Sequence, residues 1–250
     1  TKYDKPALLP HRELILYGNE DNQVMSVDGY ILDTTEKRSA HLQKHKDGAI
    51  CVPFETVAEY NQQKNREIFK HPLVYIFHDT IDKAGHDGTA KQAAQACRDA
   101  INELATMIPK ILASYNVTEV YVTSDHGFLF NDIDFAEKDK HKIEEGTIER
   151  STRYYLTRSD ADVMGMVKFP LSEVSGIVNG SDVYVAVPQG TNRLAAPSGG
   201  YMFTHGGASM QELIIPIIIC HQERDDNKQP VGVMVLDRKL SIQASRLRFK

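Results

Sequence analysis

The stretch Glu119–Phe130, EVYVTSDHGFLF, is an apolar run that ends abruptly in an acid, a histidine and a glycine. Residues 120–122 are β-branched or aromatic and the run is short, so it predicts a buried strand, most simply a parallel one. Asp125 and His126 then follow its carboxyl end, where open α/β sheets place their ligands. Gly127 permits the backbone turn that both side chains need in order to face one ion. Taken alone, Asp-His-Gly is more typical of a turn that caps a strand.

A second apolar run ends in the same way. Leu73–His78, LVYIFH, predicts another buried strand, and Asp82 and His86 follow it closely. Between the two strands, residues 90–115 have apolar side chains at intervals of three and four, which indicates a long helix. A strand, helix, strand unit is almost always a right-handed crossover that puts both strand ends at one edge of the sheet. We therefore expect the two acid and histidine clusters to meet.

Composition indicates a protein without a disulfide framework or a membrane anchor. The 250 residues carry a net charge of −5, and the sequence pI is about 6.1, so bulk charge gives no reason for tight binding to a polyanion. The three cysteines are odd in number and widely spaced, which favours a reducing compartment. The longest apolar run, 213–220, is far too short to span a bilayer. We expect a soluble, cytoplasmic protein.

The remaining pattern predicts an α/β fold: a mostly parallel sheet with helices on both faces. A surface hairpin is expected from residues 13–17 and 24–32, and a solvated helix from 34–47, whose His41 and His45 we expect at the surface. Ser209 and Glu212 have capping-box spacing before an edge strand at 214–220. We assign residues 1–225 to the core and 226–250 to the beginning of a C-terminal β segment.

The carboxylate and imidazole side chains suggest a metal site. Asp82 and His86 have the spacing that puts two ligands on one face of a helical turn. His205, in a glycine-flanked loop, offers a further ligand. Because no Cys-x-x-Cys is present, nitrogen and oxygen must ligate the ion, which suits zinc or manganese better than nickel or iron. Two such ions about 3.5–4 Å apart would clamp a phosphoryl group.

Three motifs occur in an order that resembles the metal-binding series of the alkaline phosphatase superfamily: IDKAGHD (81–87), VTSDHGF (122–128) and FTHGGASMQELIIP (203–216). The flanking segments LLPH (8–11), VYIFHDTID (74–82) and PQGTNR (188–193) resemble the PglZ domain of bacteriophage-exclusion (BREX) defence systems. The likeness runs from about Leu8 to the C-terminus.

The resemblance implies a site with two divalent ions. Asp82, His86 and His205 match the ligands of one ion. Asp125 and His126 match those of the other, whose acidic ligand on an earlier strand has no counterpart here, so that second site is predicted to be incomplete. Catalytic and substrate-binding roles fall on three further residues: Thr1 stands about where the nucleophile is expected, and Arg153 and Arg193 have the chemistry to bind phosphate.

The function implied by the resemblance is that of a metal-dependent phosphohydrolase, in particular a phosphodiesterase or nuclease of a phage-defence system. With its second site incomplete, the 250-residue chain by itself is expected to hydrolyse phosphodiesters poorly or not at all. Its substrate would be nucleic acid or another phosphodiester, and its partners other defence proteins. Two alternatives remain open. One is a non-catalytic scaffold or binding module with a structural metal. The other is a phosphomonoesterase or phosphomutase of the same superfamily. A sheet edge left exposed would also invite pairing between copies, so we include a homodimer among the expectations.

Overall fold

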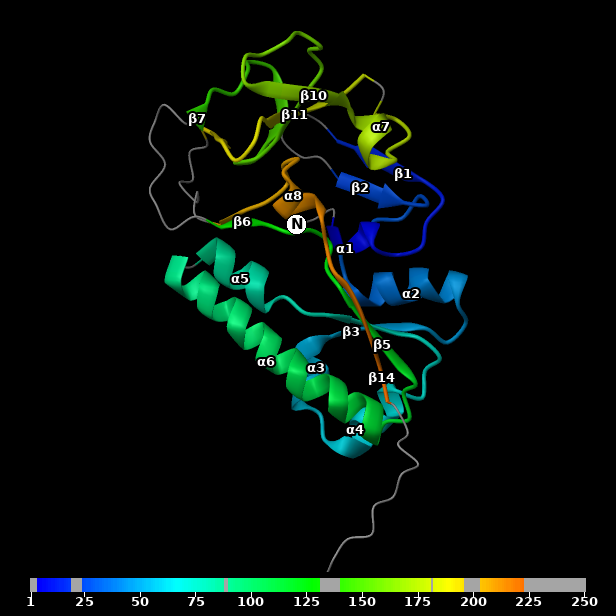
Figure 1. The fold of residues 1–250 in the computed structure, drawn as a ribbon. Coiled ribbons are helices and arrows are strands. Elements are labelled where there is room, and N and C mark those ends of the chain that lie inside the picture. The colour runs from blue at the N-terminus through cyan, green and yellow to red at the C-terminus, as the bar shows by residue number, and fades with distance from the viewer. Residues whose placement is uncertain are drawn as a thin grey trace, which may run out of the picture.

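A computed structural model of the chain describes residues 4–18, 24–87, 90–130, 140–180, 182–195 and 203–222. Thr1 and the predicted β segment 226–250, with the domain boundary before it, lie outside these ranges. Within them the fold mixes helices and strands, as the sequence predicted (Figure 1). No helix in these ranges combines the length and apolar character needed to cross a bilayer.

The helices of the described ranges are α1 (Asp4–Ala7), α2 (Thr35–His45), α3 (Phe54–Glu59), α4 (Gln62–Ile68), α5 (Thr80–Asp87), α6 (Ala90–Ser114), α7 (Leu171–Ser175) and α8 (Met210–Leu213). The strands are β1 (Leu14–Tyr17), β2 (Val24–Val27), β3 (Ile50–Pro53), β4 (Val74–Phe77), β5 (Glu119–Thr123), β6 (Leu129–Phe130), β7 (Lys140–His141), β8 (Thr147–Arg150), β9 (Tyr155–Thr157), β10 (Met166–Pro170), β11 (Tyr184–Pro188), β12 (Arg193–Leu194), β13 (Phe203–Thr204) and β14 (Ile217–His221). The predicted hairpin, the long helix α6 and strands β4 and β5 are therefore confirmed.

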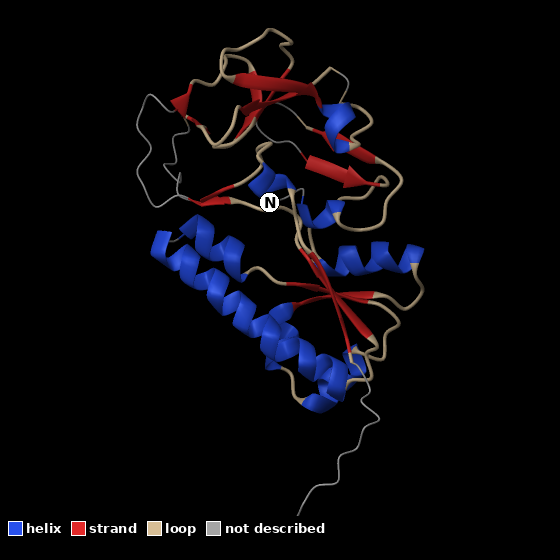
Figure 2. Cartoon of the chain, in the orientation of Figure 1, coloured by secondary structure: helices blue, strands red, loops and turns tan. Residues whose placement is uncertain are grey.

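The prediction of a mostly parallel sheet is not supported by these strands. Only the β3–β4 and β7–β12 pairs are parallel among the described ladders. The largest sheet, in the order β10-β11-β9-β8, is antiparallel throughout (Figure 2). The strand expected to be an internal parallel one, β5, pairs antiparallel with β14. The sequence pattern marks a segment as a strand but carries no information about its partner, and here the partner comes from the C-terminal part of the described chain.

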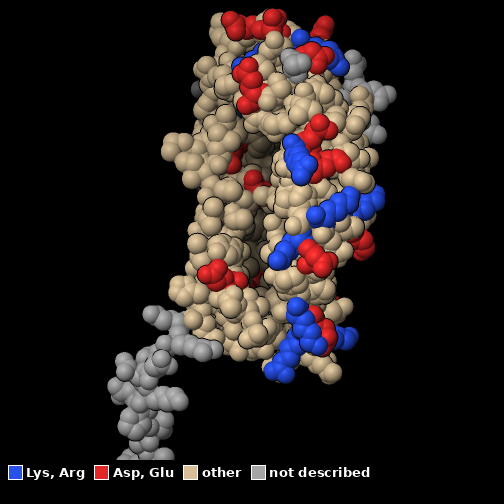
Figure 3. All heavy atoms as spheres, turned by 90° about the vertical axis from the view of Figure 1, so that its right-hand side faces the viewer, with Lys and Arg blue, Asp and Glu red and all other residues tan. Residues whose placement is uncertain are grey.

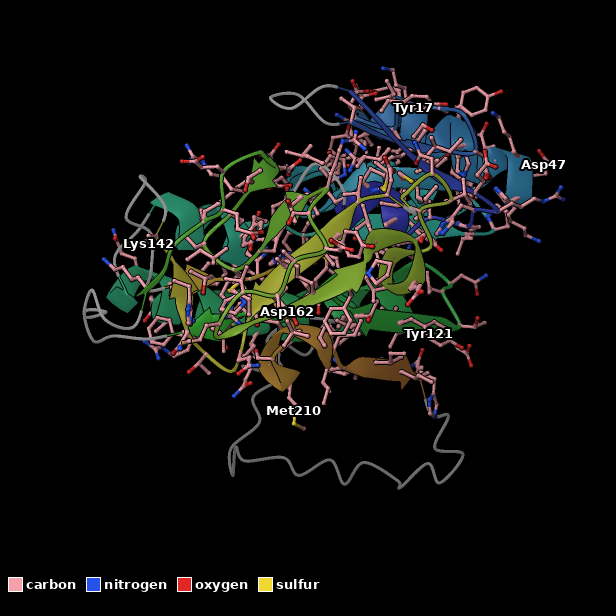
Figure 4. All side chains as sticks on the ribbon, turned by 90° about the horizontal axis from the view of Figure 1, so that it is seen from above. Tyr17, Asp47, Tyr121, Lys142, Asp162 and Met210 are labelled. Carbon is pink, nitrogen blue, oxygen red and sulfur yellow. The ribbon has the colours of Figure 1, made fainter. Side chains whose placement is uncertain are left out.

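The expected burial of β5 is also wrong. Its side chains alternate between exposed and half-buried, and Tyr121 is 61% exposed. On β14, Ile217, Ile218 and Ile219 are all more than half exposed. We call β5 and β14 together the apolar ribbon. Figure 4 shows Tyr121 and Met210, which precedes β14, on one side of the molecule and Tyr17 and Asp47 on the other.

The main core joins the N-terminal half to the antiparallel sheet. Leu14 and Val27 of the hairpin and Leu42 of α2 pack into one cluster with Ile148 and Leu156 from β8 and β9. All five are at most 5% exposed. Burying an aliphatic side chain of this size stabilises the fold by about 1.5–3 kcal/mol. The hairpin is thus fixed against α2 and the sheet rather than standing as a surface arm.

The crossover from β4 to β5 positions the predicted site. Helices α5 and α6 connect the two strands and contact each other, and α6 contacts β5. In Figure 1 strands β3, β5 and β14 lie between α6 on the left and α2 on the right. Pro109 lies within α6 without ending it. The residues after β4 and those after β5 meet at one end of these strands, as the crossover argument predicted, although no ladder joins β4 to β5 in the described ranges.

Candidate metal centre

Asp82 enters the site from the first turn of α5. The helix begins at Thr80, three residues after β4 ends. Carboxylates are favoured in the first turn because the backbone N–H groups there give the helix terminus a partial positive charge. The side chain of Asp82 is 41% exposed, so part of it remains open to solvent. Its position at the strand end is the one that the sequence predicted.

His205 is brought to Asp82 by a contact between α5 and β13. A Cβ built on Gly85 of α5 would lie 2.4 Å from the ring of Phe203, so only glycine allows this ring to pack so closely on the helix. His205 follows two residues later and is 9% exposed. Its Nε2 lies 3.8 Å from Oδ1 of Asp82. The structure therefore brings together Asp82 and His205, which the family resemblance assigned to the same ion.

His126 completes the group from the loop after β5. Its ring is stacked on that of His205, with the centroids 4.0 Å apart and the planes at 7°. Nδ1 of His126 donates to the carbonyl of Gly127 at 2.9 Å, so in the neutral ring Nε2 carries no proton. An unprotonated ring nitrogen is the form that binds a metal ion. One ligand atom from each of Asp82, His126 and His205 lies within 4.8 Å of the others. We call these three residues the metal centre.

The loop that holds His126 is tied to α8. The N–H of Gly127 donates to the carbonyl of Glu212 at 2.8 Å. A Cβ on Gly127 would lie 2.0 Å from the carbonyl oxygen of Gln211, a separation that no side chain can adopt. The sequence predicted that Gly127 permits a turn; the structure shows that it permits a close approach between two backbones. This contact fixes the loop on which His126 stands.

The predicted capping box of α8 is confirmed and has a further role. The Ser209 side chain and the Glu212 side chain bond reciprocally across the first turn. Glu212 also forms a two-pronged ion pair with Arg153, at 2.9 Å to Nε and 2.7 Å to Nη2, and accepts the N–H of Gly207 at 3.0 Å. Both charged side chains are at most 1% exposed. The Arg153–Glu212 pair therefore holds the loop from His205 to α8 against the antiparallel sheet.

Of the remaining predicted ligands, Asp125 is described and is not among the three residues grouped at the metal centre. Oδ1 of Asp125 accepts the N–H of His126 at 3.1 Å and lies 3.9 Å from Nε2 of the same residue. The side chain of His86 lies outside the described part of the chain. The structure thus groups His126 with Asp82 and His205, whereas the sequence had paired it with Asp125. Ligation by Asp82, His86, His205, Asp125 and His126 stays a prediction.

Arg153 and Arg193 are both buried, at 0% and 1% exposure. Besides Glu212, Arg153 donates to the carbonyls of Asn192 and Gly190. Arg193 donates to the carbonyl of Thr191, and burial, together with the nearby charge of Arg153, lowers the pKa of Arg193 to about 10. These contacts give the two arginines a structural role. Their predicted role as phosphate-binding residues is untested, and it would require donors that Arg153 already uses.

The three residues of the metal centre have the side-chain types of a metal site. One carboxylate and two imidazoles, without thiolate, match the nitrogen and oxygen sites that bind zinc or manganese. The two imidazole rings are stacked, so both nitrogen donors lie on the same side of Asp82. The structure shows no role for His78 at the centre: its Nε2 bonds to Oε2 of Glu103 at 2.7 Å, on α6. The residues present therefore fit a divalent ion.

Sequence reasoning missed the Arg153–Glu212 pair and the contact of Gly85 with Phe203. Ser209 and Glu212 were recognised by their spacing, but the partner of Glu212 is 59 residues away and leaves no local signal. Gly85 lies inside a motif that was interpreted through its acid and its histidine. The residues next to Gly85 in the sequence do not indicate that an aromatic ring from β13 packs against it.

Comparison with known proteins gives concordant matches. A family model described as "BREX system PglZ alkaline phosphatase-like domain" matches residues 1–220. The alkaline phosphatase-like protein PglZ of Bacillus cereus (strain H3081.97) is 29% identical over 258 residues, covering all of this chain and 30% of that protein. The alkaline phosphatase-like protein BrxZ of Escherichia coli O9:H4 (strain HS) is 30% identical over 237 residues, covering 92% of this chain and 27% of that protein. The chain thus spans less than a third of the length of either relative.

Proposed function

Because this chain belongs to the family of BREX PglZ alkaline phosphatase-like domains, we propose that it is a metal-dependent phosphoric-ester hydrolase whose divalent ion is held by Asp82, His126 and His205. The observation that carries the proposal is the convergence of these three side chains from α5, the loop after β5 and the loop after β13. They come from the three motifs that resemble the ligand series of the superfamily.

The ion would act as a Lewis acid toward a phosphoryl oxygen. The chain's own residues form the binding site for the ion. Asp82 supplies one negative charge, and the hydrogen bond from His126 to the carbonyl of Gly127 fixes the ring in the tautomer that leaves Nε2 as acceptor. His205, 9% exposed, supplies the most buried of the three side chains. The Arg153–Glu212 pair holds the His205 loop in place from outside the centre.

A phosphodiester, including nucleic acid, is the substrate class that we propose, in the setting of phage defence with other proteins of a BREX system. The net charge of −5 means that any polyanion must be bound locally. Figure 3 shows basic side chains along one side of a hollowed face, where acidic side chains lie among them, while the charges on the other side of that face are mainly acidic. Zinc or manganese is the proposed ion, with one firmly held ion expected at the metal centre. The proposed setting in phage defence also leads us to propose a cytoplasmic location.

The test is to replace His126 and His205 singly with Ala and to measure hydrolysis of a model phosphodiester and a model phosphomonoester with added Zn²⁺ or Mn²⁺. Loss of a ligand should lower activity at least as much as loss of a residue that only supports one, by about 10–100-fold or more. His221→Ala is the matched control, because its imidazole is exposed on β14. Undiminished hydrolysis by both ligand variants would overturn the proposal. Preference for the monoester would favour the alternative that the chain is a phosphomonoesterase of the same superfamily.

A scaffold role is the second candidate, and the apolar ribbon favours it. Tyr121, Ile217 and Ile219 are each at least 55% exposed, and exposed apolar surface of this kind is typical of an interface with another protein. In that case the ion would be structural. Metal would then raise the thermal midpoint of the chain, and neither ester would be hydrolysed. The same set of variants therefore separates the two functions.

A further inference from the structure

A second cluster of metal-binding side chains lies where the turn after β2 meets α2. It consists of Asp28, His41 and His45, and one ligand atom from each lies within 4.8 Å of the others. Oδ2 of Asp28 is 3.9 Å from Nε2 of His41 and 3.8 Å from Nε2 of His45. We call this the hairpin cluster. In Figure 1, α2 and α5 lie on opposite sides of the central strands, so the hairpin cluster is separate from the metal centre.

The sequence analysis placed His41 and His45 at the surface, and for His41 this is wrong. Its side chain is 2% exposed, whereas that of His45 is 31% exposed. A helix with so many charges was expected to be solvated throughout, but the face that carries His41 and Leu42 is turned into the core. A buried imidazole needs a polar partner, and here a carboxylate and a second imidazole lie beside it.

The cluster is held in position by backbone contacts. Oδ1 of Asp28 accepts the N–H groups of Arg12 and Glu13, each at 2.9 Å, which leaves Oδ2 directed to the histidines. The hydrogen bond from Arg12 lowers the pKa of Asp28, so the carboxylate stays charged. His41 and His45 stand one helical turn apart on α2, the spacing at which two imidazoles share one ion.

We propose that the hairpin cluster binds a divalent transition-metal ion, such as Zn²⁺ or Co²⁺, through Oδ2 of Asp28 and one ring nitrogen each of His41 and His45. Ligands about 2.0–2.1 Å from a tetrahedral ion lie roughly 3.3–3.4 Å apart. The observed separations of 3.8 and 3.9 Å therefore need to shorten by only about half an ångström, which side-chain rotation supplies. Imidazole and carboxylate together are the ligands that zinc and its neighbours prefer.

Ion binding changes one hydrogen bond. Nε2 of His41 contacts the carbonyl oxygen of Pro10 at 2.8 Å and therefore carries the ring proton. When Nε2 binds the ion, that proton moves to Nδ1, which has no hydrogen-bond partner among the described residues. The charge of the ring does not change. The hydrogen bond from His41 to the Pro10 carbonyl would be lost.

The ion would join two parts of the chain: the turn at Asp28 and helix α2. Its role is therefore structural, and it fastens the hairpin to the core. The proposal does not depend on the hydrolase function, because none of its residues belongs to the metal centre.

The test uses the 250-residue chain with His126→Ala and His205→Ala, which silences the metal centre. Into this background we introduce Asp28→Asn or His45→Ala, with His71→Ala as an exposed-imidazole control. Asn tolerates the left-handed backbone at position 28, where φ is 49°, and its amide oxygen can still accept the two N–H groups. Co²⁺ is titrated and followed by its visible absorption and by calorimetry. The thermal midpoint is measured with and without the ion.

The background chain and the His71 control should bind about one Co²⁺ and gain thermal stability from it. Asp28→Asn and His45→Ala should weaken binding by about tenfold or more and remove most of that gain. Their midpoints without the ion report whether each variant is folded. Equal Co²⁺ binding by all four chains would overturn the proposal, as would a background chain that binds none. In the chain with an intact metal centre, His45→Ala should leave ester hydrolysis unchanged, which separates failure here from failure of the hydrolase function.

Discussion

The metal centre and the hairpin cluster use the same chemistry, one carboxylate and two imidazoles, but are assembled differently. The hairpin cluster takes both histidines from one turn of α2 and its acid from the adjacent hairpin. The metal centre draws its three side chains from three separate segments, which only the complete fold brings together. A locally built cluster should survive changes that loosen the distant contacts. A cluster assembled over long range should not.

The largest effect is expected where the metal centre depends on a long-range contact. Arg153→Ala leaves Glu212 as a buried, uncompensated charge and should lower the free energy of unfolding by about 3–5 kcal/mol. Urea unfolding of the folded variant measures this. Arg158→Ala is the control, because the Arg158–Asp182 pair is exposed and should be worth less than about 1 kcal/mol. Ion binding should weaken at the metal centre and not at the hairpin cluster. Equal destabilisation by the two variants would contradict this.

The hairpin cluster depends instead on the packing of α2. Leu42, next to His41, is 0% exposed and belongs to the main core. Leu42→Ala should cost about 2–5 kcal/mol of unfolding free energy, because it removes apolar contacts and leaves a cavity. Leu213→Ala, 65% exposed on α8, is the matched control and should change stability little. If Leu42→Ala weakened only the ion at the metal centre, the comparison would fail.

A smaller effect concerns acid. Burial alone would raise the pKa of Glu212, but the hydrogen bonds from Arg153 and Ser209 hold it below the usual value. A carboxyl with a lowered pKa in the folded state stabilises the fold above its unfolded pKa, and this stabilisation is lost as the pH falls through the folded value. We expect the thermal midpoint to drop between about pH 5 and about pH 3, with a shallower drop in Glu212→Gln. An unchanged slope in Glu212→Gln would show that other carboxyls control the transition.

The smallest effect concerns the N-terminal cap of α2, the helix that carries both histidines of the hairpin cluster. Oγ1 of Thr34 accepts the N–H of Lys37 and caps α2 at 3.3 Å. Thr34→Ala should cost about 1 kcal/mol by chemical unfolding. Thr118→Ala, at an exposed position, should cost less. Because α2 carries both histidines of the hairpin cluster, Co²⁺ binding there should weaken slightly while the metal centre is unaffected.

Sequence reasoning found the parts of the metal centre that local pattern can reveal. Asp82, His126 and His205 were recognised because each stands at the end of an apolar run, and the crossover argument placed the first two at one edge. It did not find the antiparallel partner of β5, because a strand's period does not name its neighbour. It placed His41 outside, because a charged helix suggests water on all sides unless the packing of Leu42 is known. The role of Glu212 beyond its capping box needed a contact 59 residues away.

The 59-residue separation between Arg153 and Glu212 also bears on the order of folding. Contacts between distant residues form only after the intervening chain has been closed into a loop, and closing it costs conformational entropy that local contacts do not. The hairpin and α2 close over short distances, so they can form early. The His205 loop is held in place by the buried Arg153–Glu212 ion pair, so it should be among the last parts of the chain to become ordered. A nascent chain would therefore contain a formed hairpin cluster before it possesses a metal centre.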